Sequence, residues 1–139
     1  MSTSTVPSVL FGRVHDADRS QMAAAFLAHL GWDRVLVRSG GSAPADTVNP
    51  AVVEALAEVG IDISAEVPKA LTAEAVQVSD VVITMGCGDA CQYFLGKRYL
   101  DWQLADPAGQ GVHAVRPIRV EVEQLVCGLL VELAVRRAA

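Results

Sequence analysis

Short apolar runs along this chain alternate with stretches in which apolar residues recur every three or four positions. Residues 8–11 and 80–84 are apolar runs, and residues 34–38 alternate apolar with charged side chains. Each pattern predicts a β-strand. A fourth short strand is expected near residues 98–104, inside a long loop that covers residues 85–111.

Three helices are predicted between and after these strands. The first covers residues 19–30, the second begins with Asn49 as N-cap and Pro50 at the first helical position, and both end at a glycine, Gly31 and Gly60. A long terminal helix is expected over about residues 112–136, with Pro117 near its first turn or kinking it. Its apolar stripe consists of Val115, Ile118, Val122, Leu125, Leu129 and Leu133. Cys127 lies in an apolar run of this helix, so we expect it to be a small buried side chain.

Strands that alternate with helices predict an α/β fold with a four-stranded parallel sheet flanked by helices. One domain is expected over residues 8–139, after a flexible tail at residues 1–7. Ligands bind such sheets at the carboxyl ends of the strands. Three segments should meet there: the loop at residues 12–19, the glycine-rich turn at 39–44 and the long loop at 85–111.

The composition of the chain restricts the classes of function that it can have. The chain has 139 residues, of which 52% are hydrophobic and 19% charged, which suits a packed core. A net charge of -5 disfavours nucleic acid or an anionic membrane as partner, so a small molecule is the expected ligand, and a homodimer is compatible with the sequence. The first residues lack the features of a signal peptide, which predicts a cytoplasmic protein. No cofactor and no metal are expected.

A strand that runs through a short loop into a helix is a natural site for an oxyanion, because backbone N–H groups and the helix dipole favour negative charge there. Here the stretch reads VLFGRVHDADRSQMA, residues 9–23. It resembles the C-x5-R-S loop of the low-molecular-weight tyrosine phosphatases and arsenate reductases, most closely the actinobacterial arsenate reductases. Further matching stretches are SGGSAP at 39–44, the helix start at Asn49-Pro50, residues 80–91 and DPAGQG at 106–111. The resemblance covers roughly residues 8–135 and implies a phosphotyrosine protein phosphatase I-like fold.

In that family a loop cysteine attacks the oxyanion, a loop arginine binds it and an aspartate before proline is the general acid. The resemblance matches Arg19, Ser20 and Asp106 to the arginine, the serine and the acid. The position of the nucleophile is occupied by Arg13, which stays protonated and cannot attack phosphorus or arsenic. We therefore expect neither a competent phosphatase nor a reductase that uses a loop cysteine.

The charges of the loop differ as well. The family usually has asparagine and glycine near the middle of the loop, where this chain has Asp16 and Asp18. Two carboxylates there would repel a tetrahedral oxyanion unless Arg13 and Arg19 pair with them. The loop would then be filled with its own ion pairs, or shaped for a neutral or cationic ligand. With His15 these groups could form a new acid–base site, or be harmless charges on a loop that has lost its function.

The long loop carries two more features. Cys87 and Cys91 are either a redox pair, metal-binding thiolates or an inherited loop feature. Four aromatic residues form either an apolar wall for an organic ligand or a small satellite core. These residues are Tyr93, Phe94, Tyr99 and Trp102.

Three hypotheses follow. The first is a repurposed enzyme that performs non-redox acid–base chemistry on a small organic molecule, of a cyclase, isomerase or lyase type. The second is a catalytically silent ligand-binding or regulatory protein. The third is an arsenate reductase that uses Cys87 or Cys91. The candidate catalytic residues are His15, Asp16, Asp18 and Asp106, and the candidate ligand-binding residues are Arg13, Arg19, Ser20, Tyr93, Phe94 and Trp102.

Overall fold

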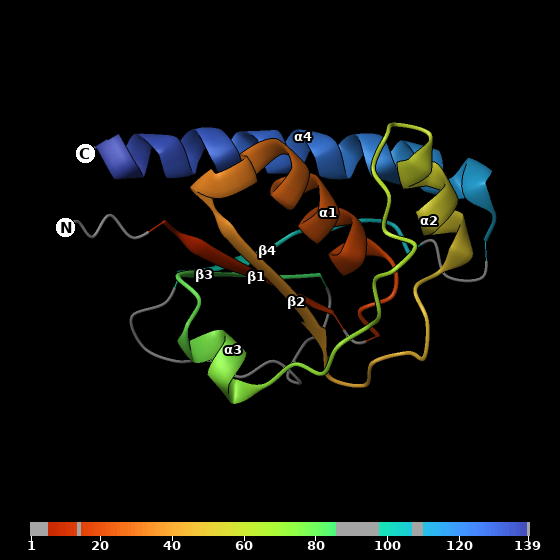
Figure 1. Cartoon of the computed structure of the whole chain (residues 1–139), viewed down its shortest axis with the longest axis horizontal. Coiled ribbons are helices and arrows are strands. Elements are labelled where there is room, and N and C mark those ends of the chain that lie inside the picture. The colour runs from red at the N-terminus through yellow and green to blue at the C-terminus, as the bar shows by residue number, and fades with distance from the viewer. Residues whose placement is uncertain (1–5, 14, 86–97, 107–109, 139) are drawn as a thin grey trace.

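The computed structural model describes residues 6–13, 15–85, 98–106 and 110–138. Four parallel strands form one sheet in the order β2-β1-β3-β4 (Figure 1). Their bounds are β1 Ser8–Arg13, β2 Leu36–Gly41, β3 Val81–Thr84 and β4 Arg98–Asp101. The predicted four-stranded parallel sheet is confirmed.

Helices cover both faces of the sheet, but unequally. The long helix α4 (Val112–Ala138) packs against α1 (Arg19–Gly31) and α2 (Pro50–Ala57) on one face, whereas the short α3 (Ala73–Gln77) lies on the other (Figure 1). A 3-10 turn, η1 (Trp32–Arg34), links α1 to β2. The terminal helix is confirmed, and Pro117 lies within it rather than ending it.

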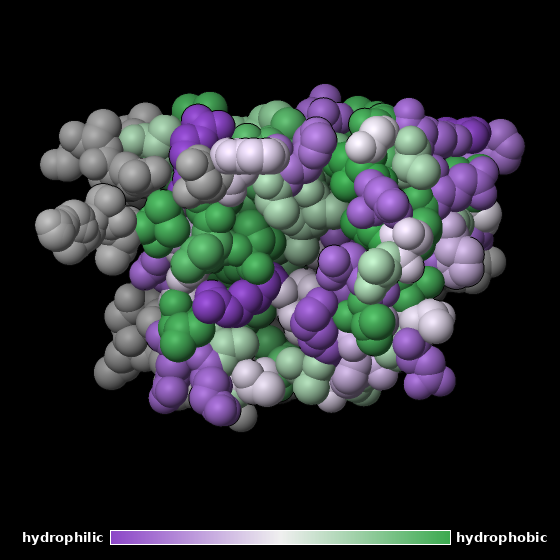
Figure 2. All heavy atoms as spheres, viewed as in Figure 1, coloured by the Kyte–Doolittle hydropathy of each residue, from purple (hydrophilic) through white to green (hydrophobic). Residues whose placement is uncertain are grey.

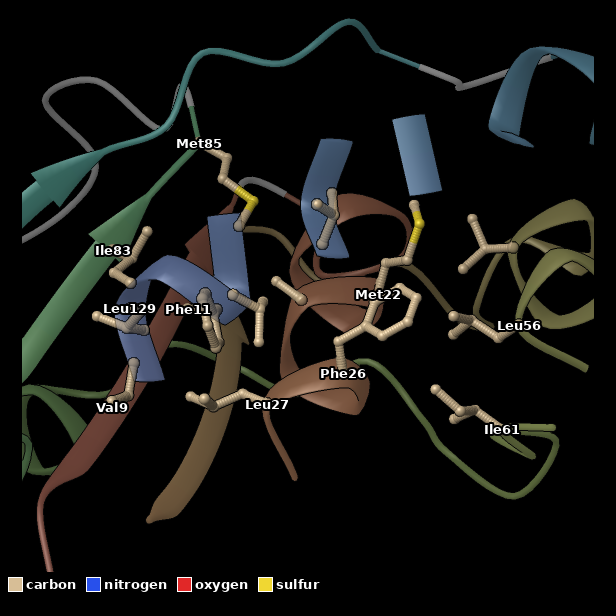
Figure 3. Packing of buried hydrophobic residues seen from close by; sticks show 14 of the residues in the cluster. Val9, Phe11, Met22, Phe26, Leu27, Leu56, Ile61, Ile83, Met85 and Leu129 are labelled. Atoms are coloured by element: carbon tan, nitrogen blue, oxygen red, sulfur yellow. The ribbon is translucent and has the colours of Figure 1, made fainter. Parts of the chain in front are cut away.

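The period of two along the strands divides the apolar residues between the two faces. Val9 and Phe11 of β1 join the main core beneath α1, α2 and α4, together with Met22, Phe26 and other residues shown in Figure 3. Leu10, between them, faces the opposite way and packs with Val76 of α3 and Val82 of β3. The larger core therefore lies on the side of α1 and α4, where it fixes the start of α1.

Local signals set the starts of two helices. The Asn49 side chain accepts a hydrogen bond from the Ala51 N–H at 3.0 Å, as predicted for an N-cap. Thr72 caps α3 in the same way. The α3 helix was not predicted, because five residues hold too few turns to show a helical period. The second helix was predicted to reach Gly60, but α2 ends at Ala57, and a turn continues to Gly60 at a φ of 84°.

The predicted bounds of three strands are wrong at their ends. β1 continues to Arg13, β4 ends at Asp101 rather than near Leu104, and β2 covers residues 36–41 instead of 34–38. The predicted turn at residues 39–41 is strand because it pairs with the end of β1. A Cβ on Gly40 would lie 2.9 Å from the Leu71 Cα, so this glycine admits a close backbone neighbour and does not form a turn.

Cys127 is exposed, so its expected burial is wrong. The buried residues of α4 around it are Val122, Val126 and Leu129, and Cys127 falls outside their spacing of four and three. None of the helices in the described ranges combines the length and the apolar character that crossing a lipid bilayer requires.

Candidate functional site

The loop between β1 and α1 lies at the carboxyl edge of the sheet and is tied to the next segment of chain. The carbonyls of Arg13, His15 and Ala17 accept hydrogen bonds from backbone N–H groups within residues 42–49, at 2.9–3.3 Å. In a trans peptide the N–H points opposite to the C=O. The N–H groups of Asp16 and Asp18 therefore point away from that segment. This alternation suits a loop whose amide donors face an anion.

Two arginines and one carboxylate meet beside this loop. The Arg13 Nη2 donates to the Asp106 Oδ2 at 3.1 Å, and the Arg19 Nη2 lies 3.6 Å from the same oxygen. The arginine side chains are 14% and 7% exposed, and that of Asp106 is 49% exposed. The topology thus brings together residues that are 93 positions apart in the chain.

A backbone carbonyl fixes the Arg19 side chain. The Arg19 Nη1 donates to the Leu104 carbonyl at 2.8 Å. Burial lowers the pKa of the Arg19 guanidinium from its ordinary value, the like charge of Arg13 lowers this pKa further, and the carboxylates of Asp106 and Asp18 raise it. An arginine stays protonated after such shifts. The two guanidinium groups therefore repel each other, and an anion between them relieves the repulsion.

The Asp16 side chain points into the protein. Asp16 is 0% exposed and its backbone has a φ of 51°. Its Oδ1 accepts from the Ser20 hydroxyl at 2.7 Å, and its Oδ2 accepts from Gln21 Nε2, the Ser39 hydroxyl and the Lys69 N–H at 2.9–3.2 Å. The expected pairing of Arg13 with Asp16 is absent from the described residues, because neutral donors satisfy this carboxylate. Asp16 thus holds the loop in shape, and its catalytic role stays a prediction.

The other predicted loop residues differ in exposure. Asp18 is 9% exposed, and its Oδ1 has no hydrogen-bond donor among the described residues. His15 is exposed, and its Nδ1 lies 3.0 Å from the Ala43 carbonyl. Ser20 is fully buried and its hydroxyl donates to Asp16, so it stabilises the loop. Their predicted contacts with a ligand stay predictions.

The two described members of the predicted aromatic group, Tyr99 and Trp102, pack in different clusters. Trp102 packs on Phe11 of the main core, with ring centroids 5.6 Å apart, whereas Tyr99 packs with Leu10 against the opposite face of the sheet. Side chains an odd number of positions apart along extended chain point to opposite faces, which separates these two rings. Tyr93, Phe94, Cys87 and Cys91 lie outside the described residues. Within the part of the chain that the structure describes, no three His, Cys, Asp or Glu side chains gather as a metal site.

Three residues of the loop's support were missed from the sequence. Gln21, Ser39 and Lys69 all bind Asp16, and they come from α1, β2 and the segment before α3. Gln21 has a weak signal, because one helical turn places it near the loop. Nothing in the local sequence marks Ser39 or the Lys69 N–H as partners of Asp16.

Comparison with known proteins identifies the family. Residues 8–139 match the low molecular weight phosphotyrosine protein phosphatase family. The chain belongs to this family, and the fold prediction is confirmed.

Arsenate reductases are among its relatives. A glutaredoxin arsenate reductase of Synechocystis is 33% identical over 129 residues, which cover 91% of this chain and 98% of the relative. The solved thioredoxin-dependent arsenate reductase of Corynebacterium glutamicum is 42% identical, with a TM-score of 0.82 over 96% of this chain. This chain covers 64% of that solved chain. The YwlE arginine phosphatase of Geobacillus stearothermophilus has the same fold, with a TM-score of 0.82 over 95% of this chain and 96% of that one, at 24% identity.

Proposed function

We propose that this protein binds a small organic acid non-covalently, with the carboxylate of the ligand held by Arg13 and Arg19. The observation that carries the proposal is that one carboxylate, that of Asp106, already lies at both guanidinium groups, 3.1 and 3.6 Å from their nitrogens. Asp106 serves here as an internal stand-in for the ligand. The loop from Arg13 to Ser20 contains no cysteine, so it offers no thiolate for the covalent step that the family resemblance implies.

The charge balance favours occupation by a ligand. Arg13 and Arg19 carry two positive charges against the single Asp106 carboxylate at their tips. An ion pair whose carboxylate is half exposed contributes only about 0–1 kcal/mol, so a ligand displaces it at little cost. A guanidinium group also matches the flat, two-oxygen geometry of a carboxylate.

The nearby Asp18 disfavours a tetrahedral dianion. Its carboxylate is nearly buried and acts electrostatically on Arg19. Like charges in a partly water-excluded site repel strongly, and a phosphate or arsenate dianion concentrates about two charges on one tetrahedral group, whereas each carboxylate group of an organic acid carries one. The proposed ligand is therefore a carboxylic acid in preference to an inorganic oxyanion.

Calorimetric titration with succinate and with inorganic phosphate tests this proposal. We expect succinate to bind more tightly than phosphate, and Arg13→Gln to weaken succinate by about tenfold or more, as loss of one partner of a charged pair does. Arg116→Gln, which removes an arginine that pairs with Glu58 instead of Asp106, is the matched control. Asp106→Asn removes the internal competitor and should tighten succinate binding about fivefold, the equivalent of about 1 kcal/mol. Tighter binding of phosphate, or weaker succinate binding in Asp106→Asn, would contradict the proposal.

A second candidate function is acid–base catalysis on the bound acid. It is favoured by the 49% exposure of the Asp106 side chain at the mouth of the site, where a displaced carboxylate can exchange protons with a substrate. In that case Asp106→Asn keeps ligand binding and loses turnover. Unchanged turnover in that variant would refute catalysis by Asp106 and leave the binding function.

The names of the relatives favour arsenate reduction as a third candidate. Its thiols would be Cys87 and Cys91. An assay of arsenate-dependent thiol consumption decides the question, with the double variant Cys87→Ser/Cys91→Ser as control. We expect no arsenate-dependent consumption in the native protein. Consumption that disappears in the double variant would establish the reductase.

A further inference from the structure

A separate pocket of about 670 Å3 lies between α1, β2 and the segment that leads to α3. Its size falls within the range of about 300–1,000 Å3 that is typical of small-molecule sites. The molecular surface around β2 carries both hydrophobic and hydrophilic residues (Figure 2). The lining of the pocket also contains both kinds. Neither Arg13, Arg19 nor Asp106 lines it, so this pocket is distinct from the proposed carboxylate site.

The first pointer to a ligand is Trp32 at the pocket wall. Trp32 is 78% exposed although it is among the largest apolar side chains of the chain. Its φ is 51°, in the region that favours glycine and that a bulky residue rarely adopts. It stands directly after α1, where its N–H bonds to the Ala28 carbonyl and where glycine is the usual residue. Backbone strain that keeps an indole out of the core is characteristic of ligand-binding positions.

The second pointer is the charge of Arg38, which also lines the pocket. The Arg38 guanidinium makes neither an ion pair nor a hydrogen bond with any described residue. By contrast, the Lys69 Nζ pairs with Glu66 at 3.4 Å, and the Asp62 carboxylate accepts from the Ser64 N–H. Arg38 is thus the lining cation whose charge is left for a ligand.

The rest of the lining includes apolar side chains. Small side chains of α1 contribute to it, as do Ile61 and Ile63. Together with the exposed indole, these surfaces suit a planar apolar group, and aromatic rings stack on tryptophan. An anionic group on that ligand would meet Arg38.

We propose that this pocket is a second ligand site, which binds a flat aromatic carboxylate stacked on Trp32 and ion-paired with Arg38. Its lining includes Gln21, Ser39 and Lys69, the same residues that hold Asp16. The site therefore adjoins the back of the loop that carries Arg13 and Arg19. It does not depend on the function proposed for that loop.

Calorimetry with 1-naphthoate and its neutral analogue 1-naphthamide tests the second site. We expect saturable binding of naphthoate at least tenfold tighter than that of naphthamide. Arg38→Gln should remove that preference, and it should do so in the Arg13→Gln background as well, where the site proposed at Arg13 and Arg19 is weakened. Equal binding of acid and amide by the native protein, no saturable binding of either, or a preference for naphthoate that survives Arg38→Gln would overturn the proposal.

Trp32→Gly separates a ligand-binding role of the indole from a structural one. Glycine accepts the positive φ at this position without strain, so the variant should fold and melt at the same or a higher temperature. We expect it to lose at least nine tenths of the naphthoate affinity. Unchanged affinity would refute stacking on Trp32. A native dimer that buries Trp32 and excludes naphthoate would assign the surface to self-association and overturn the ligand site.

Discussion

Removal of the Asp16 carboxylate should be the most damaging single change in the loop. Asp16→Ala deletes the acceptor of four donors, of which the Lys69 N–H has the least freedom to find another partner, whereas Gln21 Nε2 keeps its bond to the backbone carbonyl of residue 16. Each buried donor left without an acceptor costs about 1–3 kcal/mol, while the hydroxyls of Ser20 and Ser39 can rotate. Alanine also tolerates the φ of 51° less well than aspartate, at a cost of about 1 kcal/mol. The sum is a loss of about 2–4 kcal/mol in the free energy of unfolding.

Asp16→Asn is the matched control. The amide oxygen can take the place of Oδ2 and keep its three donors, and the amide NH2 then faces the Ser20 hydroxyl, which can turn to accept. Asparagine also tolerates a positive φ. We expect a loss of about 1 kcal/mol or less.

Urea denaturation and thermal denaturation, both followed by circular dichroism, measure both variants. In a chain of this size 1 kcal/mol corresponds to about 3–5 °C in melting temperature, so Asp16→Ala should melt roughly 6–20 °C below the native protein. An Asp16→Ala variant within 1 kcal/mol of the native protein would refute the structural role. A similar loss in Asp16→Asn would show that the negative charge matters, and that the number of acceptors does not.

Two further predictions concern the packing of helices. Hydrogen bonds from Arg116 and Arg119 lower the pKa of Glu58 from 4.5 to about 2, so its contribution to stability is complete above about pH 4.5 and is lost as the pH falls towards 2. The difference in melting temperature between the native protein and Glu58→Gln should shrink over that interval, and a constant difference would contradict the pairing. Gly31→Ala places a Cβ 2.4 Å from the Val35 Cγ1 and should destabilise the protein by about 1–3 kcal/mol in denaturant titrations. Val35→Ala should cost less stability in the Gly31→Ala background than in the native protein, and equal costs in the two backgrounds would exclude this clash.

The sequence predicted the arrangement of the sheet because strand and helix periods are local and strong. It misplaced the ends of β2 because Gly40 and Gly41 resemble a turn, whereas in the fold they pair with β1 next to the segment at Leu71. Pairing partners far along the chain decide whether such glycines form a strand. The short helix α3 is fixed by contacts of Val76 with the sheet, which no local pattern shows.

The prediction of the site from the sequence was limited in the same way. Sequence order and the family resemblance were sufficient to expect Arg13, Arg19 and Asp106 at one edge of the sheet, and the structure brings them together. The resemblance did not show that Asp16 points inward, because its donors come from three separate segments. Charges that are adjacent in the sequence suggested pairing within the loop, but side-chain direction decided otherwise.

A crystal of the native protein soaked in succinate shows whether Arg13 and Arg19 hold a carboxylate ligand. We expect a succinate carboxylate between the guanidinium groups of Arg13 and Arg19, with the Asp106 side chain moved away from both. A site that excludes succinate and keeps the Asp106 ion pairs, or one that takes up phosphate in its place, would contradict this expectation.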